Sequence, residues 1–297
     1  MEQTLTTDRA PLTWFVTGSS RGFGRALVVA ALQAGDRVAA TARRPEQLDD
    51  LVAEYGDRIL PLALDVTDAA RAADALAEAH ERFGRLDVIV NNAGYANVSP
   101  IETTDDADFR RQFETNFWGV YNVSKAAIPI LREQGGGLVI QFSSVGGRVG
   151  GSPGIASYQA AKFAIDGFSR VLRAETAPFG VRVLVVEPSG FRTDWAGSSM
   201  EVHDVPEQYQ ETVGAMNRRV RQSDAGPAGD PVRAAEILVG IAGRRDLPTN
   251  LPLGATAAEF SIAQDRRLLA SDLAWAPVSR SADADQPYPV SFPPEAA

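Results

Sequence analysis

The chain has 297 residues, of which 44% are hydrophobic and 23% are charged, a composition typical of a globular protein. It has no cysteine and only two histidines, which excludes disulfides, thiolate catalysis and cysteine-based zinc sites and leads us to expect no metal. The net charge of −9 disfavours nucleic acid as a partner, because like charges repel. No apolar run is long enough to cross a bilayer and the first residues do not resemble a signal peptide, so we expect a cytoplasmic protein without a membrane partner.

Short apolar runs alternate along the chain with segments of helical periodicity. The predicted strands cover residues 12–16, 37–41, 59–64, 86–91, 138–142 and 181–186, and the predicted helices between them cover 22–34, 45–55, 68–83, 105–133 and 157–178. Several of the strands are apolar throughout, as expected for parallel strands covered on both faces. The order predicts an α/β protein, a three-layer doubly wound Rossmann fold with a mainly parallel sheet of about seven strands.

The alternation of apolar strand patterns and helical patterns ends after residue 190. We expect one Rossmann-type domain over 1–297, made of a cofactor-binding and catalytic core at 12–190, a polar and loop-like substrate loop or lid at 191–230, and C-terminal helices and a tail at 231–297. The helices of the last part are predicted at 231–243, after Asp230 as N-cap and Pro231 in the first turn, and at 257–275.

A glycine-rich turn, Thr17–Gly24, joins the first predicted strand to the first predicted helix. Glycine lets the backbone approach a ligand, and the free N–H groups of a helix start attract negative charge, so a turn in this place is typical of a pyrophosphate site. Its spacing is T-G-x-x-x-G-x-G. The predicted cofactor contacts in the turn are Gly18, Ser20, Arg21, Gly22 and Phe23.

The end of the second predicted strand indicates which dinucleotide binds. An NAD site carries an acid there, about 20 residues past the glycines, which bonds the ribose hydroxyls. This chain has Arg43 and Arg44 at that point, and Glu46 falls beyond it. A guanidinium makes charge-assisted bonds to phosphate, so Arg43, with Arg21 near it, favours the 2′-phosphate of NADP(H) over NAD(H).

Further motifs follow in order at the ends of the predicted strands, and with the glycine turn they make the chain resemble a short-chain dehydrogenase/reductase of the shorter single-domain branch. The motifs are Asp65-Val66, Asn91-Asn92-Ala93-Gly94, Asn116-Phe117-Trp118-Gly119, Ser143-Ser144, Tyr158-Gln159-Ala160-Ala161-Lys162 and Pro188-Ser189-Gly190-Phe191-Arg192-Thr193. The resemblance covers residues 12–194.

The resemblance implies roles for these residues. Asn116, Ser144, Tyr158 and Lys162 match the catalytic tetrad, and Asp65, Val66, Asn92, Ala93, Gly94, Pro188, Phe191 and Thr193, together with Tyr158 and Lys162, match cofactor contacts. Two departures stand out. Ser189 replaces the usual glycine after Pro188, and Ser144 lies about one residue further from Tyr158 than in the family pattern, which leaves the choice between Ser143 and Ser144 open.

Tyr158 and Lys162 lie four residues apart on a predicted helix, so they share a face. The ordinary pKa of tyrosine, near 10, is too high for a base at neutral pH, and a neighbouring positive charge lowers it. We therefore expect Lys162 and an oxidised nicotinamide to bring Tyr158 into the range of general acid–base catalysis. The hydroxyl of Ser144 would bond the substrate oxygen, and the resemblance assigns Lys162 a bond to the nicotinamide ribose and Asn116 a proton relay.

These observations predict an NADP(H)-dependent oxidoreductase that acts on a carbonyl compound or a secondary alcohol. Alternatives are a non-catalytic NADP-sensing regulator, an epimerase or dehydratase of the same family, and a scaffolding subunit. The substrate would be a small molecule, and apolar residues in 191–230, among them Trp195, Val205 and Tyr209, either line its pocket or fix the loop. Apolar residues on more than one face of the helices at 105–133 and 157–178, by analogy with the family, indicate a homodimer or homotetramer.

Overall fold

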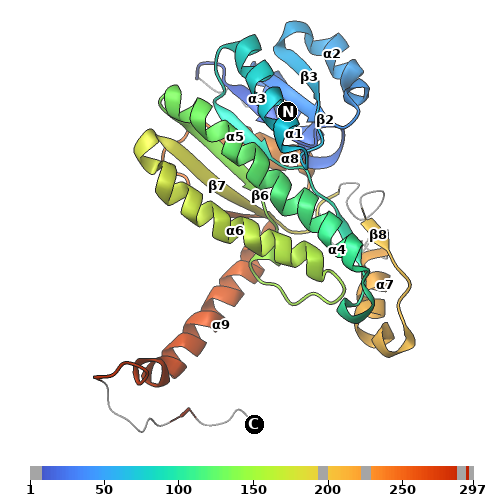
Figure 1. Ribbon diagram of the computed structural model, residues 1–297, viewed down its shortest axis with the longest axis vertical. Coiled ribbons are helices and arrows are strands. Elements are labelled where there is room, and N and C mark those ends of the chain that lie inside the picture. The colour runs from blue at the N-terminus through green and yellow to red at the C-terminus, as the bar shows by residue number, and fades with distance from the viewer. Residues whose placement is uncertain (1–8, 193–199, 222–228, 286–291, 294–297) are drawn as a thin grey trace.

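The computed structural model describes residues 9–192, 200–221, 229–285 and 292–293. Its centre is a sheet of seven parallel strands in the order β3-β2-β1-β4-β6-β7-β9 (Figure 1). The strands are β1 (Thr13–Val16), β2 (Arg37–Ala42), β3 (Ile59–Ala63), β4 (Val88–Asn91), β6 (Gly137–Phe142), β7 (Val181–Pro188) and β9 (Asn250–Leu253). The predicted doubly wound α/β fold with about seven strands is confirmed, and every pairing in the sheet is parallel.

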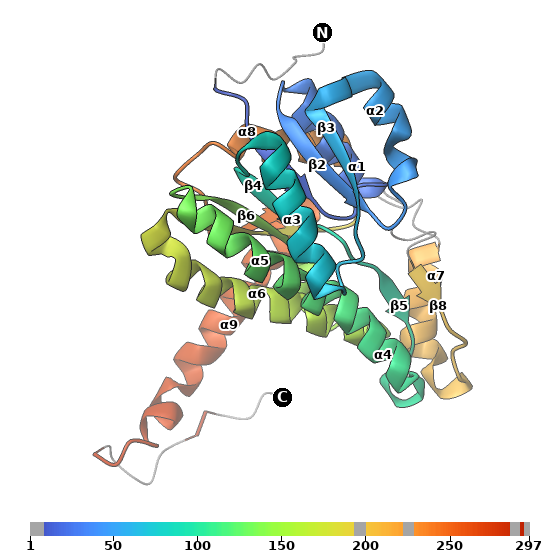
Figure 2. The ribbon, with the colours of Figure 1, turned by 45° about the horizontal axis from the view of Figure 1, so that its top comes forward.

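Helices cover both faces of the sheet (Figure 2). One layer contains α1 (Gly22–Gln33), α2 (Asp49–Tyr55) and α8 (Pro231–Ile241), and the other contains α3 (Ala69–Phe83), α5 (Gly119–Glu133) and α6 (Ala156–Thr176). The first strand shows why its sequence is apolar throughout: Trp14 and Val16 face the first layer, while Phe15 between them faces the second, and all three are fully buried.

The seventh strand, β9, was not among the predicted strands. It is four residues long, Asn250-Leu-Pro-Leu253, and lies at the edge of the sheet beside β7. A proline inside an apolar run argues against a central strand, but an edge strand tolerates it because one side needs no ladder hydrogen bond. The run is too short and too interrupted to be identified by its pattern alone.

The predicted helix at 105–133 is two helices separated by a wider turn. Helix α4 (Asp106–Phe113) runs into a π-helical turn at Glu114–Trp118, and α5 then continues the same direction. The Asp105 side chain caps α4 by accepting a hydrogen bond from the N–H of Asp108. One turn of different width leaves the apolar periodicity almost unchanged, which is why the sequence indicated a single helix.

The segment expected to be loop-like, residues 191–230, contains regular structure where it is described. Strand β8 (Met200–Val202) pairs in parallel with β5 (Ala96–Val98), and α7 (Ala215–Arg221) follows. Its two ends meet, because Phe191 pairs with Gly229 and the N–H of Gly229 donates to the carbonyl of Gly190. The prediction of a plain loop was therefore wrong for these residues.

Helix α9 (Ala255–Arg280) begins after β9 and is longer than the predicted 257–275. It extends away from the sheet, so that much of its length has no other described element beside it (Figures 1 and 2). Only Ala257 and Ser261 near its start are buried. None of the helices in the described part of the chain has both the length and the apolarity that a membrane span requires.

Candidate functional site

The glycine turn lies between β1 and α1, and its shape depends on three glycines. Gly18 and Gly22 have φ of 68° and 55°, a region that favours glycine. A Cβ on Gly24 would lie 2.2 Å from the carbonyl oxygen of Gly18, and one on Gly18 would lie 3.0 Å from Cα of Ala93. At Gly18 and Gly24 the turn is therefore packed against itself and against the segment that follows β4 too closely for a side chain.

The Asn92-Ala93 segment holds this turn in place. The hydroxyl of Thr17 accepts hydrogen bonds from the N–H groups of Asn92 at 2.9 Å and Ala93 at 3.1 Å. The side-chain amide of Asn92 donates to the carbonyls of Thr17 and Gly18. The two motifs that the sequence separates by some 75 residues therefore form one unit.

The N-terminus of α1 has the donors that a pyrophosphate needs. Arg21 at the N-cap is extended, and its own side chain makes no capping hydrogen bond to the first N–H groups of the helix. Uncapped amides at a helix start, beside glycines without side chains, are suited to phosphate oxygens. The residues present thus fit the phosphates of a dinucleotide, with Ser20 in the glycine turn and Phe23 in the first turn of α1.

The end of β2 lies beside the glycine turn, because the N–H of Ser19 donates to the carbonyl of Thr41, and β3 pairs with β2 on its other side. Arg43 follows β2, is exposed, and makes no ion pair with any described residue. Asp65 follows β3 and is exposed, with its carboxylate accepting from both the N–H and the hydroxyl of Thr67. Val66 is buried.

Asn116 lies in the π-helical turn between α4 and α5 and is fully buried. Its Oδ1 accepts the N–H of Tyr95 at 3.0 Å, and its Nδ2 donates to the carbonyl of Tyr95 at 2.8 Å. A Cβ on Gly94 would lie 2.9 Å from Oδ1 of Asn116 and 3.7 Å from Nζ of Lys162, so both side chains border the exposed backbone of Gly94. A π-turn of this kind is frequent at functional sites.

The two serines after β6 have different partners. Ser143 is buried and donates its hydroxyl hydrogen to the carbonyl of Lys162 at 3.0 Å, which ties the strand end to α6. Ser144 accepts the N–H of Gly146 at 3.0 Å, and its hydroxyl is hydrogen-bonded to Tyr158. Of the two serines that the sequence left open, Ser144 is therefore the one in contact with the tyrosine.

Tyr158 and Lys162 lie side by side on α6, both buried, with Nζ of Lys162 at 5.6 Å from the centre of the tyrosine ring. Burial raises the pKa of Tyr158 to about 12, although its hydrogen bond with Ser144 acts in the opposite direction. Burial lowers the pKa of Lys162 to about 8. The expected lowering of the tyrosine pKa is thus wrong for the protein alone, because desolvation of the phenolate outweighs the other influences.

Lys162 points its ammonium group at the backbone, where Nζ donates to the carbonyl of Phe142 at 2.6 Å. The chain after β7 lies near the glycine turn, since the ring of Phe191 packs on Phe23 with centroids 4.7 Å apart. Pro188 is buried at the end of β7, and Ser189, the departure from the family pattern, donates its N–H to the carbonyl of Leu253. Thr193 lies outside the described residues.

Apolar side chains from several segments surround the ring of Tyr158. The cluster comprises Ala96, Val98, Ile155, Tyr158 and Val213, with Val205 and Tyr209 packed against it. These residues come from β5, the loop before α6 and the 200–221 segment. Val205 and Tyr209 therefore fix the 200–221 segment to this cluster, and their place in a substrate pocket stays a prediction.

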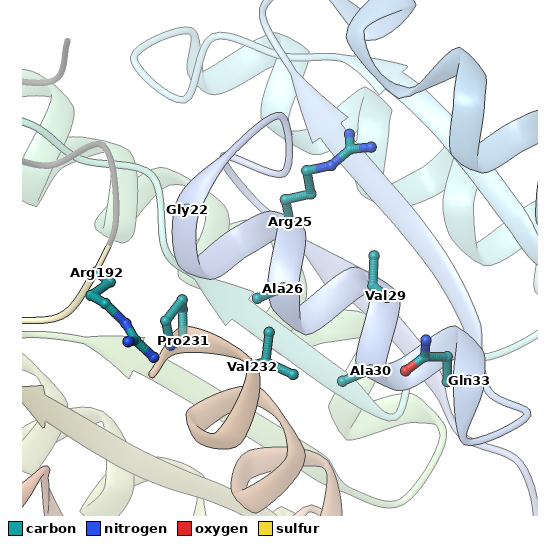
Figure 3. Close-up of a pocket in the computed structure, with 9 residues that line it drawn as sticks. All are labelled: Gly22, Arg25, Ala26, Val29, Ala30, Gln33, Arg192, Pro231 and Val232. Carbon is teal, nitrogen blue, oxygen red and sulfur yellow. The ribbon is translucent and has the colours of Figure 1, made fainter. Parts of the chain in front are cut away.

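A separate groove lies between α1 and α8 (Figure 3). Its lining residues are Gly22, Arg25, Ala26, Val29, Ala30, Gln33, Arg192, Pro231 and Val232. Of these residues, only Gly22 and Arg192 belong to segments with predicted cofactor contacts. The two arginines of the groove are already in ion pairs, Arg25 with Asp50 and Arg192 with Asp230. The groove is lined by none of the four residues Asn116, Ser144, Tyr158 and Lys162.

Some residues of the site could not be identified from the sequence. The backbone of Tyr95 positions Asn116, but no side-chain pattern marks a backbone partner. The buried Asp108 on α4 accepts from Asn97 at 2.6 Å and lies 3.3 Å from Nε2 of His203, a link between β5, α4 and the end of β8. An aspartate in the first turn of a helix more often signals only favourable interaction with the helix dipole.

Comparison with known proteins gives consistent matches along the chain. The family model described as short chain dehydrogenase matches residues 13–203. Oxidoreductase BOA17 of Botryotinia fuckeliana is 49% identical over 267 residues, which cover 90% of this chain and 97% of that protein.

Two solved structures extend the comparison to three dimensions. A short-chain dehydrogenase from Streptomyces avermitilis is 39% identical, with a TM-score of 0.85 over 93% of this chain and 100% of that one. A short chain dehydrogenase from Burkholderia cenocepacia, solved in complex with NADP, is 27% identical, with a TM-score of 0.69 over 89% of this chain and 97% of that one.

Proposed function

Since this chain belongs to the short-chain dehydrogenase/reductase family of oxidoreductases, we propose that it reduces a carbonyl compound, or oxidises the matching secondary alcohol, with Tyr158 exchanging the proton. The observation that carries the proposal is the hydrogen bond between the buried Tyr158 and Ser144, beside the ammonium group of Lys162. Asn116 completes the proposed catalytic group.

The proposed coenzyme is NADP(H). Arg43 at the end of β2 is exposed, and the described part of that strand end offers no carboxylate to bond the ribose hydroxyls of NAD(H). The Burkholderia cenocepacia relative with bound NADP supports the same choice. The phosphates would lie on Gly18, Ser20, Arg21, Gly22 and Phe23, and the adenine beside Asp65 and Val66. The nicotinamide would lie near Asn92, Ala93, Gly94, Pro188, Phe191 and Thr193.

When bound, the nicotinamide supplies the hydride, and the chain supplies the proton and the geometry. With its pKa near 12, Tyr158 holds its hydroxyl hydrogen at neutral pH and is ready to donate it to the substrate oxygen. Ser144 bonds the same oxygen as negative charge develops on it. The charge on Lys162 then stabilises the phenolate that forms, and Asn116 orders the backbone at Tyr95 through which a water relay would run.

The pKa directions describe which protonation states of Tyr158 and Lys162 are present at neutral pH in the protein without coenzyme. Oxidation of an alcohol would need Tyr158 as phenolate, the form that burial disfavours. Reduction needs the phenol and the charged Lys162, and both are present below about pH 8.

The substrate would lie over the apolar cluster of Ile155 and Val213 around the Tyr158 ring, with 191–230 as a lid. We also propose a homo-oligomer in which α5 and α6 pair with a second copy. Its support is a group of exposed apolar side chains on or next to these helices, Trp118, Phe163, Val171 and Phe179.

The test is a panel of ketones and aldehydes with NADPH and NADH, followed by absorbance of the reduced coenzyme. Steady oxidation of NADPH, with a higher kcat/KM than for NADH, is the expected result. Binding of NADPH without turnover across the panel would instead support the NADP-sensing regulator, and absence of binding would support a scaffolding subunit. Product without net change of coenzyme would support an epimerase or dehydratase.

A further inference from the structure

Gln159 follows Tyr158 on α6 and has no part in the chemistry described above. Its side chain is 8% exposed. Its Oε1 accepts a hydrogen bond from the N–H of Ser152 at 3.2 Å, in the glycine-rich loop between β6 and α6. This bond fixes the orientation of the side-chain amide, because a backbone N–H requires the oxygen to face it.

The other end of the amide is left without an acceptor. Among the residues that the structure describes, Nε2 of Gln159 is buried and donates to no protein group. A buried donor without a partner costs free energy, and most such groups in folded proteins are paired. An orphaned N–H beside a reactive tyrosine therefore points to a ligand atom as its partner.

The orphaned Nε2 faces the same place as the hydroxyl of Ser144. A Cβ on Gly146 would lie 3.2 Å from Nε2 of Gln159 and 3.4 Å from Oγ of Ser144. Both polar groups therefore lie within contact distance of the same point beside the Cα of Gly146, which carries no side chain. Ser144 also contacts Tyr158, which connects that point to the proposed reacting centre.

We propose that Nε2 of Gln159 donates a hydrogen bond to a second oxygen of the substrate. The substrate class is then an oxygenated ketone, whose hydroxyl or further carbonyl lies one or two carbons from the reacting carbonyl. The inference rests on the proposed function, because Tyr158 and Ser144 hold the reacting oxygen. The apolar cluster of Ile155 and Val213 takes the rest of the molecule, which is a hydrocarbon chain or ring.

The discrimination expected from one such bond is considerable. A site that has a buried donor leaves it unpaired when the substrate lacks the matching oxygen, so the plain ketone is disfavoured. One neutral hydrogen bond corresponds to a preference of roughly ten-fold in kcat/KM.

The experiment compares a β-hydroxy ketone with the same ketone lacking the hydroxyl, using NADPH and the full chain. Three variants are measured beside the wild type. Gln159→Met removes both polar ends of the amide, Gln159→Glu keeps an acceptor for Ser152 but removes the donor, and Gln33→Leu changes an exposed glutamine at the far end of α1. Melting temperature and NADPH affinity are recorded for each protein.

The expected result is that the wild type and Gln33→Leu prefer the β-hydroxy ketone by about ten-fold, and that both Gln159 variants lose this preference. Equal kcat/KM for the two ketones in the wild type would overturn the inference and leave the proposed function intact. The inference would also be overturned if Gln159→Glu kept the preference for the β-hydroxy ketone, or if Gln159→Met lowered kcat/KM equally for both ketones. Either result would mean that Gln159 only supports the loop. Turnover of neither ketone with either coenzyme by the wild type would overturn the proposed function and the inference together.

Discussion

Asn116 binds the backbone of Tyr95 through both atoms of its side-chain amide, accepting the N–H at 3.0 Å and donating to the carbonyl at 2.8 Å. The pair joins the π-helical turn before α5 to the segment between β4 and β5. Because the next residue back from Tyr95 is Gly94, which borders Lys162, the bond also sets the backbone beside the proposed catalytic group.

We predict that Asn116→Ala lowers the free energy of unfolding by about 2 kcal/mol, because two buried hydrogen bonds are lost. It should also lower kcat strongly, since the backbone at Tyr95 is no longer fixed. Urea unfolding and steady-state kinetics measure the two effects. Gln134→Ala is the matched control: its side-chain amide accepts the N–H of Leu86 at 3.2 Å and donates to the carbonyl of Gly136 at 2.9 Å at the other end of α5, so it loses stability without the loss of kcat. Equal kinetic losses in both variants would contradict the role of Asn116.

Arg43 is predicted to determine the coenzyme. Arg43→Ala should lower kcat/KM for NADPH by roughly ten-fold or more, because charge-assisted hydrogen bonds to the 2′-phosphate are lost. NADH has no such phosphate, so the kcat/KM of Arg43→Ala with NADH should stay at the wild-type value. The control is Arg44→Ala, the neighbouring exposed arginine. If Arg43→Ala weakens both coenzymes alike, the arginine acts only through general charge.

Lys162 should make stability depend on pH in a defined direction. Its pKa is about 8 in the folded protein and 10.5 ordinarily. Between these values the unfolded chain holds the proton that the folded chain has lost, so the free energy of unfolding rises with pH. Relative to Lys162→Met, the gain over this range is about 3 kcal/mol.

The measurement for Lys162 is urea unfolding of the coenzyme-free wild type and Lys162→Met at several pH values between neutral and alkaline. The other titrating groups are common to both proteins and cancel in the difference. A difference that stays constant, or that falls as the pH rises, would show that burial does not lower the lysine pKa.

A charged network outside the proposed site ties the loop after β6 to the rest of the fold. Arg148 donates to the fully buried Glu187 on β7 at 3.1 Å and to Asp265 on α9 at 2.5 Å. Arg148→Met would leave Glu187 with Asn250 as its remaining partner, and we expect a loss of about 2 kcal/mol. Arg170→Met is the control, since Arg170 pairs with Asp166 at an exposed position of α6 and should cost under about 1 kcal/mol. Thermal and urea unfolding measure both losses. Equal losses in the free energy of unfolding for Arg148→Met and Arg170→Met would contradict the role of this network.

Much of this fold could be predicted from local patterns because each central strand is covered on both faces and reads as an apolar run, as in Trp14-Phe15-Val16. Strand β9 was missed since an edge strand needs no such run and tolerates Pro252. The segment after Phe191 gains β8 only by pairing with β5, a contact between residues about a hundred positions apart that no local pattern contains.

The site divides in the same way. The motifs indicated Tyr158, Lys162 and the glycine turn, but they left Ser143 and Ser144 open, and only the structure shows which hydroxyl contacts the tyrosine. For the protein without coenzyme, the expected direction of the tyrosine pKa was wrong, since burial depends on what packs around the ring, namely Ile155, Val213 and their neighbours. The orphaned amide of Gln159 was equally invisible in the sequence, because only the bond to Ser152 shows which end of the amide is free.

The central claim is that Tyr158 exchanges the proton with the substrate. The most direct test is Tyr158→Phe, with Tyr121→Phe on α5 as the matched control, measured for kcat with a turned-over ketone and for NADPH affinity by fluorescence titration. We expect that Tyr158→Phe folds, binds NADPH and loses kcat by about a hundred-fold or more, while Tyr121→Phe keeps its turnover. A Tyr158→Phe protein with kcat near that of the wild type would contradict this claim.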